Sequence, residues 1–537
     1  MHDRILLLIS LMALSLGTLA CTGGSDGTGL PVTTVTVSGT VMYEDREYDE
    51  SGFTFFSEPS PVRQAMVEVV AEATQGVLAS SVTNSTGGYR VVFDAIAGTR
   101  AYVRVLADTS GSPGVPPVTV VSPLSDSAIH SFAGPSFNVD EGPITSDIIM
   151  DSSSPAGGAF NILDVMTAAG LFVNSLQGDF PPPVTARWTQ GYTDWYYGTS
   201  FSGGNIWVSG SVSDTDEYDD DVLWHEYGHF AADAFSKDDS PGGPHDFLTN
   251  DLDLRLSWSE GWGGYFQGAL KRWLSLDPVL SGVLSLAPGT PLTQYVDTDS
   301  GGTYNSKDMA DPGGSPYMFS SNEVAVAKVL LDLEGAPEYG PQPVWDIFNS
   351  IHSYLLPLEQ VTLEAFWDGW VTMEGRSVIA NTAIANRLVF YQEDSWESLG
   401  DDTPNASRLA VVNGAGEEHY LYSESSPWDT DYIAFEAVSP GSYKIETLCM
   451  RNGADTYLRL MGSDGAVLPG LSSNDDTPVV PICSASPYPF AYQFFSSRVI
   501  YNIDTPGIYY AEVTASGSPK TTYAGRYGTY TLIINGP

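Results

Sequence analysis

The spacing of apolar residues changes twice along this chain of 537 residues. From about residue 33 to 150 they alternate with polar residues in short runs such as TVTVSGTVMY, AMVEVVAEA and RAYVRVLA. From GGAFNILDVMTAAGLFVNSL onward they recur at helical spacing, and near residue 400 the alternation returns in DYIAFEAV and GIYYAEVTA. Alternation predicts half-buried strands, whereas the longer period predicts helices packed on a core.

This pattern predicts a multidomain protein, because 537 residues are too many for one hydrophobic core. We predict an N-terminal β-sandwich over residues 33–152, a central α+β domain over 153–400 and a C-terminal β-sandwich over 401–537. The 54 glycines and 35 prolines are consistent with many turns between short strands.

The N-terminus carries the apolar stretch ILLLISLMALSLGTLA, which is too short for a stop-transfer helix and typical of a signal peptide over residues 1–20. Cys21 follows and resembles the lipidated cysteine of bacterial lipoproteins, although Thr18 and Leu19 depart from that pattern. We predict that residues 21–32 form a flexible tether. We expect either an outer-membrane-anchored lipoprotein of the cell envelope or, after simple cleavage, a secreted protein.

Charge and cysteine usage limit the partners further. The formal net charge of −44 argues against nucleic acid and against anionic lipid, so membrane contact is expected only through the lipid anchor. Cys449 and Cys483 suit one disulfide in an oxidising compartment, with two buried thiols as the alternative.

Clustered acids in the last region raise the expectation of bound Ca²⁺. They are Asp429 with Asp431 and Asp475 with Asp476. Ca²⁺ takes oxygen ligands, but exposed loop acids without any metal are the alternative.

The stretch DDDVLWHEYGHFAADAF holds the residues with the clearest chemistry. His225 and His229 are four residues apart, so on a helix they project from one face and can share a metal ion, with Glu226 beside that ion. This is the His-Glu-x-x-His arrangement of zinc peptidases, in which zinc activates a water and the glutamate takes its proton. We expect the aspartates before the helix to cap its N-terminus, and the upstream NIWVSG to form an edge strand for an extended peptide.

A hydrolytic zinc site also needs a third protein ligand. The candidates that follow the motif are Asp233, His245, Asp251, Asp253 and Glu260. Glu260 lies in LSWSEGWGGYFQGAL, which predicts a second buried helix, where a lone carboxylate is costly unless it is paired or bound to metal.

The segments DVLWHEYGHF and SEGWGGYF together resemble the gluzincins, in particular fungalysin-like and thermolysin-like zinc metallopeptidases. The resemblance implies a zincin-like central domain in which His225, His229 and Glu260 bind zinc and Glu226 is the general base. Two departures stand out: the interval of 31 residues from His229 to Glu260 is long, and Gly264 stands where these families commonly have an aspartate that supports a zinc-binding histidine.

The resemblance also implies a histidine that stabilises the oxyanion, before the next core helix. Phe319 falls near that position, Tyr317 offers a phenol two residues earlier, and His352 is a distant alternative. For Tyr317, an aromatic residue that covers the core is the competing interpretation.

The flanking regions have resemblances of their own. VSGTV, PVRQAMVEVV and TNSTGGYRVVF are similar to carboxypeptidase regulatory-like domains, and DTDYIAFEAVSPGSYKIET with ADTYLRLMGSDG and TPGIYYAEV resembles the bacterial pre-peptidase C-terminal domain of secreted proteases. We therefore expect an exported, monomeric zinc endopeptidase acting on proteins or peptides. The alternative is a catalytically inactive zinc-binding surface protein that serves adhesion or scaffolding.

Overall fold

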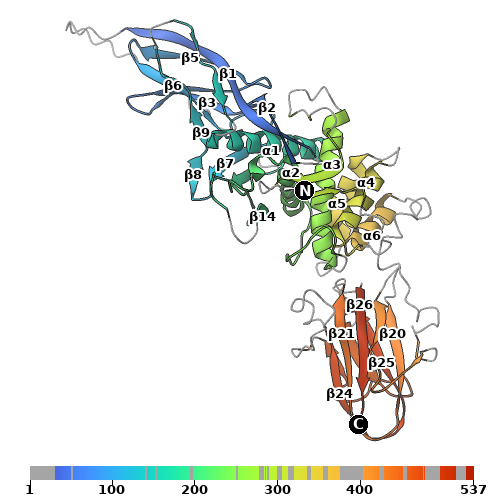
Figure 1. The fold of residues 1–537 in the computed structure, drawn as a ribbon. Coiled ribbons are helices and arrows are strands. Elements are labelled where there is room, and N and C mark those ends of the chain that lie inside the picture. Colours follow the sequence, from blue (N-terminus) through green and yellow to red (C-terminus); the bar gives the residue numbers. More distant parts are fainter. Residues whose placement is uncertain are drawn as a thin grey trace, which may run out of the picture.

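The computed structural model gives a strand-rich chain with several sheets and a central group of helices (Figure 1). Its description covers residues 31–49, 52–139, 142–151, 154–193, 198–249, 252–276, 284, 286, 290–298, 305–311, 320–335, 340–354, 361–374, 403–404, 407–421, 429–451, 456–475, 477, 496–515 and 528–537. The predicted signal peptide, Cys21 and most of the tether lie outside this part of the chain.

Two sheets form the N-terminal region. The long β1 (Val32–Asp49) pairs with β2 (Gly52–Pro61), β5 (Gly88–Ile96), β11 (Ile144–Thr145) and β12 (Ile148–Met150). The second sheet consists of β3 (Met66–Ala71), β4 (Val77–Val82), β6 (Arg100–Leu106), β9 (Ser131–Ala133) and β10 (Phe137–Asn138). Buried residues alternate with exposed or partly exposed ones along β5 and β6, as the sequence pattern predicted, and the buried faces of both sheets belong to one core.

A third sheet joins this region to the central one. Its strand order is β14 (Ser200–Ser202), β15 (Asn205–Trp207), β13 (Val184–Arg187), β7 (Val118–Ser122) and β8 (Ser125–Ile129). Strands β7 and β13 run parallel, as do β13 and β15. The predicted division between residues 152 and 153 therefore cuts through one sheet and one continuous hydrophobic core, because β7 pairs with β13 across it.

Six helices make up most of the described central region. They are α1 (Pro155–Gln177), α2 (Asp220–Phe235), α3 (Leu254–Leu276), α4 (Glu323–Gly335), α5 (Pro341–Tyr354) and α6 (Leu363–Glu374). The side chain of Ser154 caps α1, Pro155 occupies its first turn, and Gly178 ends it in the left-handed conformation. By length and composition α1 could cross a membrane, but 89% of its most apolar window is buried inside the protein, as in a core helix.

The N-terminus of α2 is built differently from the prediction. Asp219 does occupy the N-cap position, but its side chain makes no capping hydrogen bond. Its carboxylate instead accepts hydrogen bonds from the backbone N–H and the hydroxyl of Thr298, which follows β16 (Gln294–Asp297). Asp221, in the first turn of the helix, forms a buried ion pair with Lys271 of α3 and accepts from the Val296 N–H. These acids connect α2, α3 and β16.

The C-terminal region has a hydrophobic core of its own. One sheet contains β18 (Leu409–Ala410), β20 (Thr430–Ala437), β25 (Gly507–Ala515), β22 (Thr456–Met461) and β23 (Ser473–Asp475). The other contains β19 (Glu417–Leu421), β26 (Gly528–Asn535), β21 (Gly441–Arg451) and β24 (Arg498–Ile503). Buried residues of both sheets form one cluster, the arrangement of a β-sandwich.

The structure describes some, but not all, of the cysteines and acids that the sequence singled out in this region. Cys449 is disulfide-bonded, while its predicted partner Cys483 lies outside the described residues. Asp429 and Asp431 are buried, so they are not exposed loop acids, and Asp431 accepts a hydrogen bond from the Tyr530 hydroxyl. Asp475 is exposed at the end of β23, and Asp476 lies outside the described residues.

Helix α3 packs on α4 through glycine, and this contact generates a stability prediction. A Cβ at Gly261 would lie 2.5 Å from the Val326 Cβ and 2.8 Å from the Glu323 carbonyl oxygen. We expect Gly261→Ala to lower the free energy of unfolding by about 1–3 kcal/mol, because backbone cannot yield to the added methyl. Urea unfolding followed by tryptophan fluorescence measures this.

Gly264→Ala in the same helix is the matched control. Its Cβ would meet the flexible Met309 Sδ at 3.1 Å and the Ala327 Cβ at 3.5 Å. We expect unchanged stability or a gain of up to about 1 kcal/mol, because alanine favours helix over glycine. Equal losses in both variants would contradict this account of the α3–α4 contact.

Candidate metal centre

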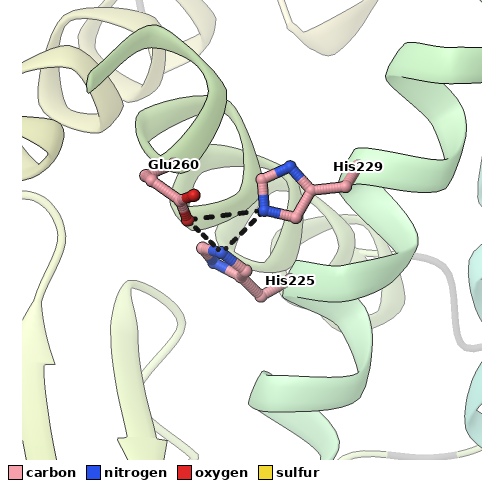
Figure 2. A group of neighbouring side chains, drawn as sticks. All are labelled: His225, His229 and Glu260. Carbon is pink, nitrogen blue, oxygen red and sulfur yellow. Dashed lines mark hydrogen bonds and ion pairs between the residues drawn. The ribbon is translucent and has the colours of Figure 1, made fainter. Parts of the chain in front are cut away.

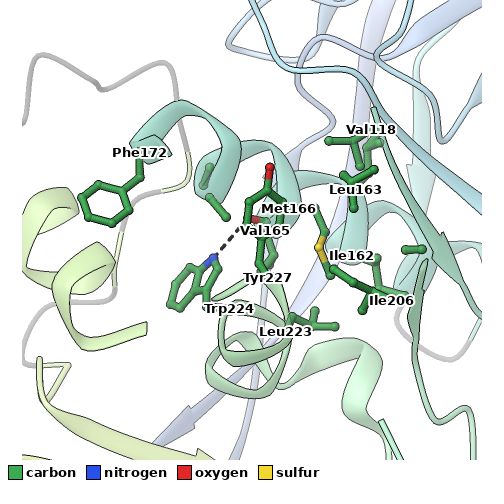
Figure 3. Close-up of a cluster of buried hydrophobic side chains, with 14 of the residues drawn as sticks. Val118, Ile162, Leu163, Val165, Met166, Phe172, Ile206, Leu223, Trp224 and Tyr227 are labelled. Atoms are coloured by element: carbon green, nitrogen blue, oxygen red, sulfur yellow. Dashed lines mark hydrogen bonds between the residues drawn. The ribbon is translucent and has the colours of Figure 1, made fainter. Parts of the chain in front are cut away.

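One face of helix α2 packs against the core, and another carries the two histidines of the motif. His225 and His229, one turn apart, point to the same side of the helix (Figure 2). Trp224 and Tyr227 are fully buried with residues of α1 and the neighbouring sheet (Figure 3), and the Trp224 indole donates to the Val165 carbonyl of α1 at 3.1 Å. These buried contacts fix the rotation of α2 and so the direction of the histidines.

Glycines allow α2 and α3 to approach closely. A Cβ at Gly228 would lie 3.1 Å from the Gly263 Cα and 3.1 Å from the Phe266 Cβ. A Cβ at Gly263 would lie 2.7–2.8 Å from three atoms of the His225 ring. The Trp262 indole also donates to the Gly228 carbonyl at 3.0 Å. No larger side chain fits at position 263 unless the His225 ring moves.

The close approach brings Glu260 of α3 to both histidines (Figure 2). Glu260 Oε2 lies 3.1 Å from His225 Nε2 and 3.4 Å from His229 Nε2, and the two Nε2 atoms are 3.2 Å apart. The three side chains are only 11–14% exposed. Residues 35 positions apart in the sequence thus offer three donor atoms around one point.

This donor set is compatible with zinc. Ligands bound at 2.0–2.2 Å in a tetrahedron lie about 3.3 Å from one another, and the three separations here are 3.1, 3.2 and 3.4 Å. Two imidazoles and one carboxylate are also a ligand set of catalytic zinc sites, which keep a fourth position for water. The residues present therefore have the chemistry and the spacing that zinc needs.

The charges around this point also favour a cation. Burial opposes a charge on His229, but the carboxylates of Glu260, Glu226 and Asp238 raise its pKa to about 10. Burial likewise opposes a charge on Glu260, yet His229, with His225 and His245, holds its pKa well below the usual range. A buried carboxylate is stable only beside positive charge, which protons on the histidines or a metal ion can supply.

Glu226 lies beside this group of donors. Its Oε2 accepts a hydrogen bond of 2.6 Å from the backbone N–H of Phe201 in β14. The side chain is buried, and burial raises its pKa although His229 and His225 act in the opposite direction. The carboxylate is therefore oriented by the edge strand of the third sheet.

The histidines differ in their supporting contacts. The Ser259 hydroxyl donates to Asp238 at 2.8 Å and lies 3.2 Å from His229 Nδ1, so it accepts the proton of that nitrogen. With this proton held on Nδ1, Nε2 is the nitrogen through which His229 would bind a metal. His225 Nδ1 is buried and has no hydrogen-bond partner among the described residues. Gly264, the position at which the resemblance noted in the sequence would place an aspartate, packs near Met309.

Of the other described candidates for the third ligand, only His245 approaches the site. Asp233 is exposed on α2, Asp253 forms an ion pair with Arg255 at 2.7 Å, and Asp251 lies outside the described residues. His245 does approach the site: its Nε2 is 3.6 Å from Glu260 Oε1, and its Nδ1 is 2.9 Å from Glu323 Oε2. His245 thus lies next to Glu260, on the side of the other carboxylate oxygen.

The structure does not describe the first two residues considered for the oxyanion. Tyr317 and Phe319 lie outside the described residues, and His352 lies in α5. A residue that the sequence did not single out is Tyr295 of β16, whose ring centroid is 5.8 Å from that of His225. Its pKa is raised well above 10 by burial and by the charges of Asp297 and Glu226. No local signal marks Tyr295, because a hairpin far along the chain brings it here.

Comparisons with known proteins assign no family. No family model and no curated protein matches the chain. Among solved structures, the pre-peptidase C-terminal domain of collagenase from Bacillus anthracis is 15% identical, covers 24% of this chain and 95% of its own, and has a TM-score of 0.16. The Paenibacillus sp. cycloisomaltooligosaccharide glucanotransferase is 11% identical over 92% of this chain and 72% of its own, with a TM-score of 0.13. Similarities this low leave the metal centre to be interpreted from its own geometry.

Proposed function

We propose that the chain is an exported zinc-dependent endopeptidase of the gluzincin type, with a zincin-like domain over residues 153–400. The observation that carries this proposal is the convergence of His225, His229 and Glu260, with the buried Glu226 beside them. A zinc ion with a purely structural role has no use for a carboxylate that is not a ligand. A hydrolytic site needs one as a general base.

The roles of the residues follow from their positions. His225, His229 and Glu260 hold the zinc, which when bound acts as a Lewis acid toward water and a substrate carbonyl. Glu226 accepts the proton of the attacking water and delivers it to the departing amine. The Phe201 N–H holds Glu226 in position, and the Ser259 hydroxyl holds the ring of His229.

A peptide substrate has a place beside these groups. The predicted edge strand NIWVSG turned out to be an inner strand, because β14 covers β15 through a hairpin whose turn is Gly203-Gly204. Among the described strands the edge on this side of the sheet is β14, and the backbone N–H of its central residue Phe201 donates to Glu226. We propose that an extended peptide lies along β14, because backbone pairing would align it with the general base.

The remaining features concern location. The proposed signal peptide and Cys21 would place the enzyme on the cell envelope as an outer-membrane lipoprotein, or secrete it. The C-terminal sandwich, proposed to be of the pre-peptidase type, is an accessory module in this scheme. The acidic surface suits an extracellular protein that must stay soluble.

The ligand assignment predicts a clear loss of metal. Glu260→Ala should lose zinc as severely as His225→Ala or His229→Ala, because each removes one of three protein ligands. Asp233→Ala, an exposed change on α2, is the matched control and should keep one zinc per chain. Metal analysis of the dialysed full-length proteins decides the point, and full occupancy in Glu260→Ala would move the third ligand elsewhere.

The general-base assignment predicts a separation of binding from chemistry. Glu226→Gln should retain zinc and fold while hydrolysis of casein falls at least about 100-fold, because general-base catalysis contributes about 10²–10⁴-fold. Asp233→Asn on the same helix should leave the rate unchanged.

Two results would contradict this mechanism. One is wild-type hydrolysis by Glu226→Gln. The other is a zinc-loaded wild-type protein, tested after removal of any propeptide, that cleaves no unfolded protein; this result supports the alternative, an inactive zinc-binding surface protein for adhesion or scaffolding.

The anchor is tested separately. We expect the wild-type protein, expressed with its own N-terminus, to partition with membranes and Cys21→Ser to be released, because the lipid would be attached to the thiol. Fractionation followed by immunoblotting measures this. If both proteins are soluble, Cys21 is only a residue near the cleavage site.

A further inference from the structure

A second group of acidic residues lies near the start of α2. Asp214 closes a short turn by pairing with Ser211, Asp216 begins the 3-10 helix η1 (Asp216–Tyr218), and Asp297 ends β16. One carboxylate oxygen from each lies within 4.8 Å of the others. Segments about 80 residues apart in the sequence therefore direct three acids to one point.

Asp216 supplies an independent sign of a ligand. The residue is 4% exposed, and its Oδ1 is buried without a hydrogen-bond partner among the described residues. Its Oδ2 accepts from the Thr199 hydroxyl. A buried carboxylate oxygen normally has a partner, because leaving it unpaired sacrifices its hydration without compensation. The unpaired Oδ1 of Asp216 therefore indicates a binding site for a group that interacts with carboxylate oxygen.

The electrostatics of this group point the same way. Burial raises the pKa of Asp216 well above its usual value, and the charges of Asp219, Asp214 and Asp297 raise it further. Asp219 is fully buried, and Asp297 and Asp214 act on its pKa in the same direction. These neighbouring charges are all carboxylates. Such a concentration of negative charge becomes favourable when a cation binds in its midst.

We propose that Asp214, Asp216 and Asp297 bind a Ca²⁺ ion. All the donors are carboxylate oxygens, which suit a hard cation, whereas zinc prefers nitrogen and sulfur. Oxygen atoms that share Ca²⁺ at 2.3–2.6 Å lie at most about 5 Å apart, and the three oxygens meet this limit. Waters complete the coordination.

The bound ion would hold β16 against the start of α2. Val296 of β16 already donates to Asp221 of α2 at 3.1 Å, and Tyr295 contacts the His225 ring. A cation that bridges Asp297 to Asp216 would add a further link and keep β16 beside the candidate metal centre. The calcium site stands on its own residues and does not depend on the proposed peptidase activity.

Calcium binding to the full-length protein tests the proposal. Equilibrium dialysis with radioactive calcium, after EGTA treatment, should show that Asp216→Asn binds about one Ca²⁺ fewer per chain than the wild type, because the site loses a charged ligand. Asp214→Asn, at a less buried position, is the second variant and should show the same loss. Asp233→Asn, an exposed change on α2 outside every acidic cluster considered for calcium, is the matched control and should bind as the wild type does.

Thermal unfolding provides a second test, because the proposal predicts the direction in which the melting temperature changes. Without calcium, Asp216→Asn should melt at or above the wild-type temperature, because it removes one repelling charge. With calcium it should melt below the wild type, because it cannot be stabilised by the ion. Unchanged calcium binding in both variants, or a melting difference independent of calcium, would overturn the proposal. Zinc content, measured in the same samples, shows separately whether the zinc centre is intact.

Discussion

The close contact between α2 and α3 is the constraint on which the rest of the candidate metal centre depends. Gly228 and Gly263 remove the side chains that would hold the helices apart, and the His225 ring occupies the space that a Cβ at position 263 would take. Only at this separation can Glu260 of one helix reach two histidines of the other. The buried ion pair of Asp221 with Lys271 joins the same two helices at a second point. The catalytic residues of the proposed enzyme therefore derive their geometry from packing, not from the motif alone.

Carboxylates buried around α2 have to be balanced, and the structure uses several means to do so. Lys271 balances Asp221, backbone and hydroxyl donors of Thr298 serve Asp219, and histidines surround Glu260. Asp216 has the Thr199 hydroxyl for one oxygen and nothing among the described residues for the other. The proposed zinc and calcium ions would complete this balance. Because β16 contacts α2 through Val296 and Tyr295, an ion at one site would restrain the other.

The sequence predicted the parts of this arrangement that depend on local periodicity. His225 and His229 share a face because four residues make about one helical turn, and the apolar pattern around Glu260 indicated a buried helix. The sequence could not predict the pairing of β7 with β13, which extends one sheet across the expected domain boundary. Nor could it place β14 outside β15, Asp219 against Thr298, or His245 between Glu260 and Glu323. These contacts join segments distant in sequence, and residue type alone does not specify which partner a strand or a loop acid will meet.

The position of Glu226 favours the proposed peptidase over a site that would only hold zinc. Among the described residues three donors converge, one fewer than a closed structural zinc site requires. The carboxylate of Glu226, the residue directly after His225, instead accepts a hydrogen bond from the N–H of Phe201, which lies on an edge strand of the third sheet. A peptide that paired with this edge would meet the proposed general base and the proposed metal ion at the same place. An arrangement that only stabilised the fold would have no reason to combine an open position, a buried proton acceptor and a strand edge beside them.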